Sequence, residues 1–163
     1  MSVSTPYVDS VCSLGDGLVV TKCVGMGKIF VFRADFVDVT KETSNKTMYQ
    51  DVEVLAVFCW HKTDNFYMNI GGSVKHDLML CGDDQGRTWV YKLPTWLKDS
   101  DRENSYDLDE KILPLGHLLW PDLGKHAVSG QTMLDKVAVS PCGLYLVAVT
   151  NTNIVAIWKK ELI

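Results

Sequence analysis

Short apolar runs recur along the chain, and a turn signal follows each of them. The runs are rich in Val, Ile, Leu and aromatic residues, and almost no window keeps a helical period for three turns. Gly, Asn and Asp between the runs accept the positive φ angles that tight hairpins require. The pattern therefore predicts an all-β fold. The predicted strands are Val8–Ser13, Leu18–Cys23, Ile29–Arg33, Val52–Phe58, Phe66–Ile70, Asp77–Cys81, Thr88–Lys92, Ile112–Leu119, Lys136–Ser140, Tyr145–Thr150 and Ile154–Lys159.

The predicted strands form three copies of a repeat. Each copy has a strand, a turn, a second strand with a small or polar exit, another turn and a third strand. The third strand ends each time in an aromatic residue followed by a basic one: Phe32-Arg33, Tyr91-Lys92 and Trp158-Lys159. The stretches "VEVLAVFCW" and "KILPLGHLLW" are predicted to add an outer fourth strand to the first two copies.

This repeat resembles the WD-repeat β-propeller, in which the third strand of a blade ends in an aromatic-Asp pair. Here Arg or Lys replaces the Asp in every copy, and Gly116-His117 matches the Gly-His that often opens a WD repeat. The resemblance implies a structural hydrogen-bond network for His117. It also implies about three blades in one partial propeller, at residues 7–58, 64–120 and 133–160. Because propellers close with about four to eight blades, we expect the C-terminal part of a larger, seven-bladed ring, whose remaining blades cover the open edges.

Several stretches resemble one group of propellers more closely. "YVDSV", "LVVTK", "DNFYMNI", "LCGDDQGRTWVYKL" and "YLVAVTNTNIVAIWKK" follow the order seen in the C-terminal blades of the Polycomb WD-repeat subunit, the embryonic ectoderm development protein. The leucine-rich-repeat and WD-repeat proteins associated with the origin recognition complex belong to the same chromatin-binding group, and the chain is identified as a member of that family. The resemblance implies a nuclear, chromatin-associated scaffold with protein subunits of a chromatin or replication-origin complex as partners.

The same resemblance bears on the adjacent aromatic residues Phe66 and Tyr67. In the Polycomb subunit, two aromatics at this place belong to a cage that holds trimethyl-lysine, so the pair is predicted to form part of a methyl-lysine cage for histone tail peptides. A quaternary ammonium donates no hydrogen bond and is held by ring faces. Asn69 stands where the family has a basic residue, which departs from the family pattern. The alternative is ordinary packing, in which strand alternation turns one ring into the core and the other outward.

Composition narrows the classes of function. The chain has 163 residues, 47% of them hydrophobic and 22% charged, which is typical of a globular protein. A net charge of −4, with scattered basic residues, argues against direct nucleic-acid binding through a broad basic face. No apolar run approaches the length of a membrane helix, so no membrane partner is predicted.

The sequence contains no constellation typical of catalysis. Cys59 and His61 are two residues apart, which does not place a thiol and an imidazole for proton transfer. The histidines show no zinc spacing with cysteine, and the five cysteines mostly lie in apolar runs, as small buried hydrophobic residues do. We therefore expect no enzyme, metal or cofactor. Two functions stay open: a methyl-lysine reader, and a pure protein–protein scaffold without such a pocket.

Overall fold

The computed structural model describes residues 7–33, 54–61, 63, 65–98, 111–118 and 132–160. Nearly all regular structure in these residues is β-strand, together with two short 3-10 helices, η1 (Val74–His76) and η2 (Thr95–Lys98). The predicted all-β fold is confirmed. The strands are β1 (Val8–Gly15), β2 (Leu18–Cys23), β3 (Lys28–Arg33), β4 (Val54–Cys59), β5 (Ile70–Ser73), β6 (Leu78–Gly82), β7 (Thr88–Lys92), β8 (Gly116–Leu118), β9 (Leu134–Val139), β10 (Tyr145–Thr150) and β11 (Val155–Lys159).

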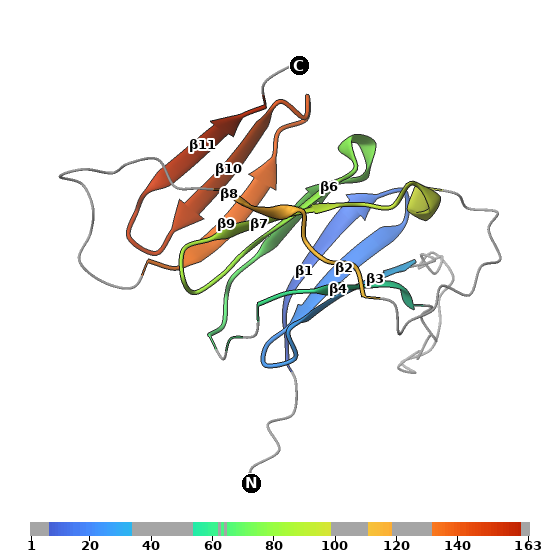
Figure 1. Cartoon of the computed structure of the whole chain (residues 1–163), viewed down its shortest axis with the longest axis horizontal. Coiled ribbons are helices and arrows are strands. Elements are labelled where there is room, and N and C mark those ends of the chain that lie inside the picture. The colour runs from blue at the N-terminus through green and yellow to red at the C-terminus, as the bar shows by residue number, and fades with distance from the viewer. Residues whose placement is uncertain are drawn as a thin grey trace, which may run out of the picture.

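Three antiparallel sheets stand side by side like the blades of a propeller (Figure 1). Each is a simple meander, because strands that follow one another in the chain pair side by side: β1-β2-β3-β4, then β5-β6-β7-β8, then β9-β10-β11. The first strands β1, β5 and β9 contact one another in sequence, so they form the inner side of the array. The predicted outer fourth strands are present as β4 and β8, and the third sheet has three strands among the described residues.

One predicted strand is wrong. Phe66–Ile70 is not a strand, because β5 begins only at Ile70 and continues through Gly71 and Gly72 to Ser73. Tyr67 has φ = 71°, which is incompatible with an extended strand. Glycine is required inside β5 because a Cβ at Gly71 would lie 2.3 Å from the backbone oxygen of Val137 in the neighbouring sheet.

The eighth predicted strand, Ile112–Leu119, is shorter than expected. Ile112 instead makes an isolated parallel bridge with Phe58 of β4, and antiparallel pairing with β7 begins at Gly116. Pro114 lies between these two pairings and has no backbone N–H to donate to a ladder. Positions 119–120 and 52–53 of the predicted strands lie outside the described residues.

The core lies between the sheets. The larger apolar cluster joins the first sheet to the second, and Phe58 meets Tyr91 edge to face across this boundary with ring centroids 5.6 Å apart. A smaller cluster joins the second and third sheets through Leu80, Leu134 and Ala148. Burial of these apolar faces is the main stabilising term of the fold.

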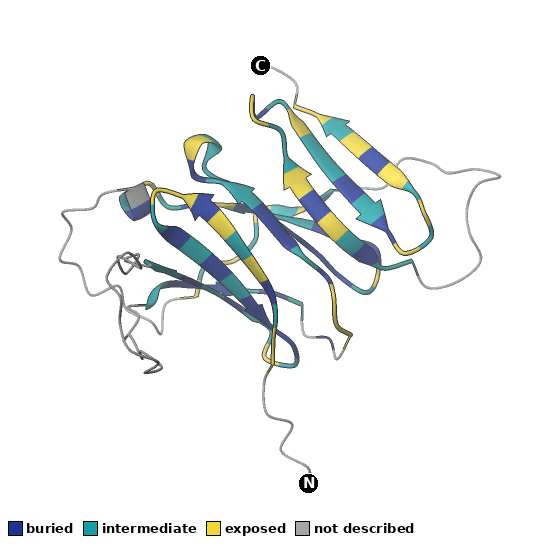
Figure 2. Ribbon diagram, turned by 180° about the vertical axis from the view of Figure 1, so that it is seen from behind, coloured by how far each residue is buried: buried dark blue, intermediate teal, exposed yellow. Residues whose placement is uncertain are grey.

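The two end sheets each leave an apolar face uncovered. On β11, Val155 and Ile157 are exposed while Ala156 between them is buried, and the stripe is visible in Figure 2. Val11 on β1 is exposed at the other end of the array. Strands that are apolar at successive positions, and so on both faces, are typical of sheets that are covered on both sides. These faces suit the remaining blades that the sequence predicts.

Gly71→Ala tests the close approach of the second and third sheets. We expect it to destabilise the protein by about 1–3 kcal/mol, because the new methyl group meets rigid backbone rather than a flexible side chain. The measurement is the thermal denaturation midpoint of the full-length protein. Ser73→Ala, at the end of the same strand, is the control and should change it little; an unchanged midpoint for Gly71→Ala would refute the close packing.

Candidate peptide-binding site

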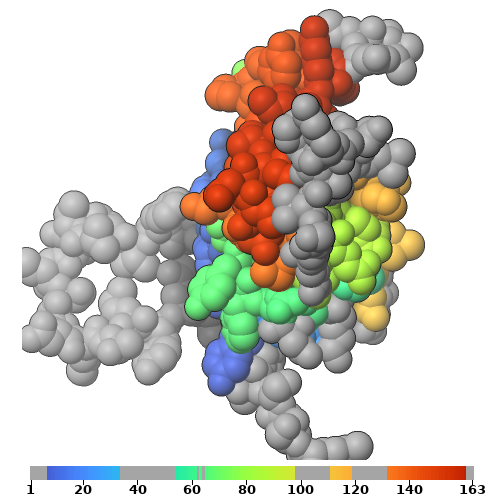
Figure 3. Space-filling view, turned by 90° about the vertical axis from the view of Figure 1, so that its left-hand side faces the viewer, coloured from blue at the N-terminus to red at the C-terminus, as the bar shows by residue number. Residues whose placement is uncertain are grey.

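Three exposed aromatic rings form a row at one end of the first two sheets. Phe66 and Tyr67 lie in the loop between β4 and β5, and Tyr7 lies just before β1. Their exposed fractions are 44%, 81% and 59%, so neither predicted cage residue enters the core. The ring centroids of Tyr7 and Phe66 are 6.3 Å apart, and those of Phe66 and Tyr67 are 6.2 Å apart. In Figure 3 this green loop lies next to the blue start of β1. The structure thus adds Tyr7 to the predicted pair.

Tyr67 occupies an unusual backbone conformation. Its φ of 71° is in the left-handed region, which few residues other than Gly, Asn and Asp adopt. Such a conformation costs of order 1 kcal/mol and persists only where the surroundings impose it. The turn lies three residues before the start of β5, and both Phe66 and Tyr67 are exposed there.

Trp60 fastens the start of the loop that carries the rings. Its indole is buried, and Nε1 donates a hydrogen bond to the Gly82 carbonyl of β6 at 3.2 Å. The ammonium of Lys22 lies 4.3 Å from the centroid of the same ring and pairs with Asp9 at 2.6 Å. Trp60, at the start of the loop, therefore packs against the buried ion pair of Lys22 and Asp9.

Asp84, in the turn between β6 and β7, holds the middle of the loop. Its Oδ2 accepts hydrogen bonds from the Thr63 hydroxyl and from Asn65 Nδ2, and its Oδ1 lies 3.3 Å from His61 Nε2. Burial alone would raise the pKa of Asp84, but the two hydrogen bonds and the nearby imidazole lower that pKa below its ordinary value. The carboxylate is consequently charged at neutral pH and ties the loop to the second sheet.

Two backbone bonds complete the anchoring. The N–H of Gly25 donates to the Thr63 carbonyl at 3.0 Å, and the N–H of Asn69 donates to the Asp135 carbonyl of the third sheet at 2.9 Å. All three sheets thus fix the loop. A rigid, exposed aromatic surface is the arrangement that binds a cation through ring faces with little loss of conformational entropy.

Comparison with known proteins places the chain in a family. The profile of the WD domain of leucine-rich repeat and WD repeat-containing protein 1 matches residues 1–161. The chain belongs to this family. The Xenopus laevis and Homo sapiens proteins of that name are 30% identical over 157 residues and 29% identical over 160 residues. Each match covers 94% of this chain but 21% and 23% of those relatives, so the chain spans about a fifth of their length.

The solved structures that it resembles support the same fold. A chain in the crystal structure of an active polycomb repressive complex 2 in the basal state superposes with a TM-score of 0.60 at 16% identity. A chain of ctPRC2 in complex with H3K27me3 gives a TM-score of 0.59 at 15% identity. The matches cover 98% and 97% of this chain and 52% of each of those chains. The predicted WD-repeat type is confirmed, and such propellers serve as protein-interaction scaffolds.

The predicted repeat residues occupy different environments within these WD-repeat blades. Tyr91 is fully buried, and its hydroxyl donates to the Cys59 carbonyl at 2.8 Å. Trp158 is half-buried against the smaller core cluster, and Phe32 is half-buried opposite Val19 of β2. The equivalent third-strand aromatics thus pack to different depths.

His117 lies on the outermost strand of the second sheet. It is exposed on β8, where its ring meets Trp89 edge to face at 5.2 Å, and no hydrogen bond to it is found within the described residues. The reason is its position on the outermost strand, where no further strand lies against it in the described part of the sheet. A structural hydrogen-bond network at His117 stays a prediction.

Asp83 is the buried polar residue whose full role the sequence did not reveal. The sequence marked it as a turn former, but it accepts four hydrogen bonds while fully buried. Oδ1 accepts from the backbone N–H groups of Gln85 and Arg87, and Oδ2 accepts from Arg87 Nε and Trp89 Nε1. The aromatic and basic residues that follow "GDD" are the signal that could have indicated this network.

The cysteines of the described residues lie in buried, half-buried and exposed positions. Burial raises the pKa of the Cys81 thiol well above its usual range, so this sulfur stays protonated at neutral pH. Cys142 is the exception to the predicted burial, because it lies exposed in the turn before β10. Across the described ranges, no three His, Cys, Asp or Glu residues are grouped to hold a metal ion. No helix in the described part of the chain could span a membrane.

Proposed function

We propose that this chain forms part of a chromatin-associated WD-repeat module that recognises trimethylated lysine in histone tails. Phe66, Tyr67 and Tyr7 supply one side of the aromatic cage, and blades beyond this chain supply the rest. The module also acts as a scaffold for protein subunits of a nuclear complex. One observation carries the proposal: three exposed rings form a row on a loop that all three sheets hold rigid.

The chemistry of the ligand follows from these side chains. A trimethylammonium group presents a diffuse positive charge and methyl groups, which ring faces attract by about 0.5–2 kcal/mol. A ring face has no lone pair to accept the hydrogen bonds that an unmodified lysine ammonium donates. The choice of a trimethyl-lysine mark also draws on a complex that contains a chain of the same fold, ctPRC2 in complex with H3K27me3 and H3K27M.

Phe66→Ala is expected to weaken trimethyl-lysine binding about fivefold or more, because one ring face is lost from the cage. The measurement is calorimetric titration of the full-length protein with trimethylated and unmodified histone peptides. Tyr145→Ala is the matched control, since Tyr145 is 38% exposed at the end of β10 far from the loop.

The outcomes separate the two functions that remain open. Binding that prefers the methylated peptide, that is lost with Phe66→Ala and that survives Tyr145→Ala supports the reader. If the folded wild-type protein binds both peptides equally or not at all, the module is a scaffold without a methyl-lysine pocket.

A further inference from the structure

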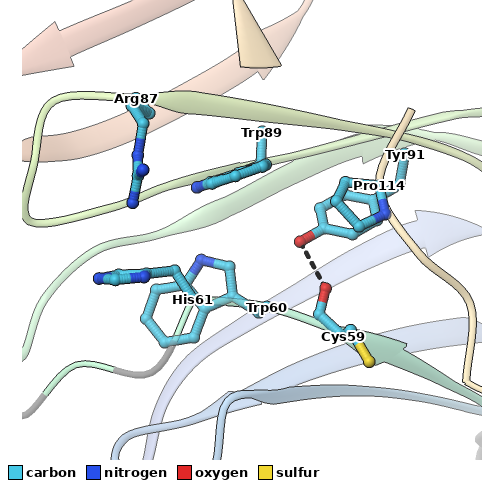
Figure 4. A pocket seen from close by; sticks show the side chains of 7 residues that line it. All are labelled: Cys59, Trp60, His61, Arg87, Trp89, Tyr91 and Pro114. Carbon is cyan, nitrogen blue, oxygen red and sulfur yellow. Dashed lines mark hydrogen bonds between the residues drawn. The ribbon is translucent and has the colours of Figure 1, made fainter. Parts of the chain in front are cut away.

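A second aromatic site lies on the outer side of the first two sheets. It is a groove of about 280 Å³ (Figure 4). Residues at the end of β4 form one wall, residues at the start of β7 form the other, and a proline closes one end. The lining residues are Cys59, Trp60, His61, Arg87, Trp89, Tyr91 and Pro114.

A strap at residues 111–118 joins the outer edges of the two sheets beside this groove. At one end, Ile112 exchanges backbone hydrogen bonds with Val57 and Cys59 on the outer edge of β4. At the other end, Leu115 N–H donates to the Val90 carbonyl of β7, and the strap continues as β8. Pro114 lies between these anchors and faces the groove in Figure 4.

The strap has exposed apolar side chains that the further blades of a complete propeller would not cover. Leu113 and Leu115, on either side of Pro114, are each 69% exposed. Neighbouring blades pack against the faces of a sheet, so the uncovered stripe on β11 suits a further blade. The strap lies instead along the outer edges of two sheets that already contact each other. Exposed leucines beside an aromatic groove are typical of a surface that binds a protein partner.

The side chain of Arg87 provides unused hydrogen-bond donors in the groove. Arg87 Nε and Trp89 Nε1 both bond to Asp83, and Trp60 Nε1 and the Tyr91 hydroxyl donate to backbone carbonyls. Both oxygens of Asp83 already accept two bonds, so the Nη groups of Arg87 remain without a partner among the described residues. The Arg87 side chain is partly exposed, and Figure 4 shows its guanidinium reaching toward His61 across the groove. A ligand that lies beside Arg87 can therefore accept hydrogen bonds from its Nη groups.

We propose that this groove binds a short peptide segment of a partner protein in which an acidic residue adjoins an apolar or aromatic one. The apolar side chain lies between Trp89 and Pro114, and the carboxylate accepts hydrogen bonds from Arg87, whose fork suits bidentate recognition. A volume near 280 Å³ is below the range of about 300–1,000 Å³ typical of small-molecule pockets, and it suits one large side chain. This site is separate from the aromatic row and does not depend on methyl-lysine recognition.

The test uses fluorescein-labelled octapeptides of Ser and Gly that carry one variable pair of residues. The pair combines Glu, Gln or Lys with Phe, Leu or Ala in both orders, and fluorescence anisotropy reports binding to the full-length protein. We expect the Glu-Phe and Glu-Leu pairs to bind at least tenfold more tightly than their Lys counterparts and than Glu-Ala. Phe66→Ala should leave this binding unchanged.

A matched pair of charge variants places the peptide at the strap. The Glu-Phe peptide is expected to bind Leu113→Glu about twofold to fivefold more weakly than it binds Leu113→Lys, because exposed charge pairs are worth about 0.2–1 kcal/mol. Leu113 is exposed, so both variants should fold. The proposal is overturned if no Glu peptide binds the wild-type protein, if Lys peptides bind equally well, or if both Leu113 variants bind alike.

Discussion

Lys22→Met is expected to destabilise the first two sheets by about 3–5 kcal/mol, because it leaves the buried carboxylate of Asp9 without its charged partner. The side chain of Lys22 is fully buried and that of Asp9 is 3% exposed, with 2.6 Å between Nζ and Oδ2. Asp9 Oδ1 has no hydrogen-bond partner among the described residues, so the Lys22 ammonium is the main compensation for the burial of this carboxylate. Methionine preserves the apolar stem against Trp60 but removes the charge, and the carboxylate must then remain charged without a partner or become protonated.

Hydrogen exchange in peptides that cover β2 and β3 measures this loss in the full-length protein. A change of 3–5 kcal/mol corresponds to a fall in protection of about two to three and a half orders of magnitude. The double variant Lys22→Met, Asp9→Leu is the control, since replacing both partners by apolar groups of similar size is often neutral. A fall of less than tenfold in Lys22→Met, or no recovery in the double variant, would contradict the role of the pair.

Local pattern was sufficient to predict the repeat. The period-2 alternation and the hairpin turns depend on neighbouring residues, so β2, β7 and β10 were placed with their observed bounds. The start of β5 could not be predicted in the same way. Phe66 and Tyr67 have high strand propensity, yet contacts with two other sheets impose the left-handed turn, and the close approach of Val137 requires glycine within the strand.

The candidate site was predictable only in part for a similar reason. Resemblance indicated Phe66 and Tyr67, but the third ring, Tyr7, comes from the opposite end of the first blade and meets them only in the folded chain. Lys22 did leave a signal. It continues the alternation of Leu18 and Val20 on β2, which places its charge on the buried face, and a buried lysine requires a partner. The identity of Asp9 as that partner depends on the register of β1 and β2.

The Asp83 network joins both proposed binding surfaces. Its turn presents Asp84 to the loop that carries the aromatic row, and its Oδ2 orients Arg87 and Trp89 in the groove. Asp83→Ala leaves two backbone N–H groups, one indole and one guanidinium without their acceptor in a buried place. Because each unsatisfied buried donor costs about 1–3 kcal/mol, and partial access of water relieves some of them, we expect a total loss of about 3–5 kcal/mol.

Gln85→Ala in the same turn is the control for Asp83→Ala, because the Gln85 side chain is exposed and its backbone N–H is retained. Hydrogen exchange of the β6–β7 hairpin should rise by two or more orders of magnitude in Asp83→Ala and stay within about threefold in Gln85→Ala. Binding of the trimethylated peptide and of the Glu-Phe peptide should weaken together in Asp83→Ala, since one hairpin orients both surfaces. Loss of one kind of binding with the other intact would show that the two surfaces do not share this support, and unchanged exchange would show that Asp83 does not stabilise the hairpin.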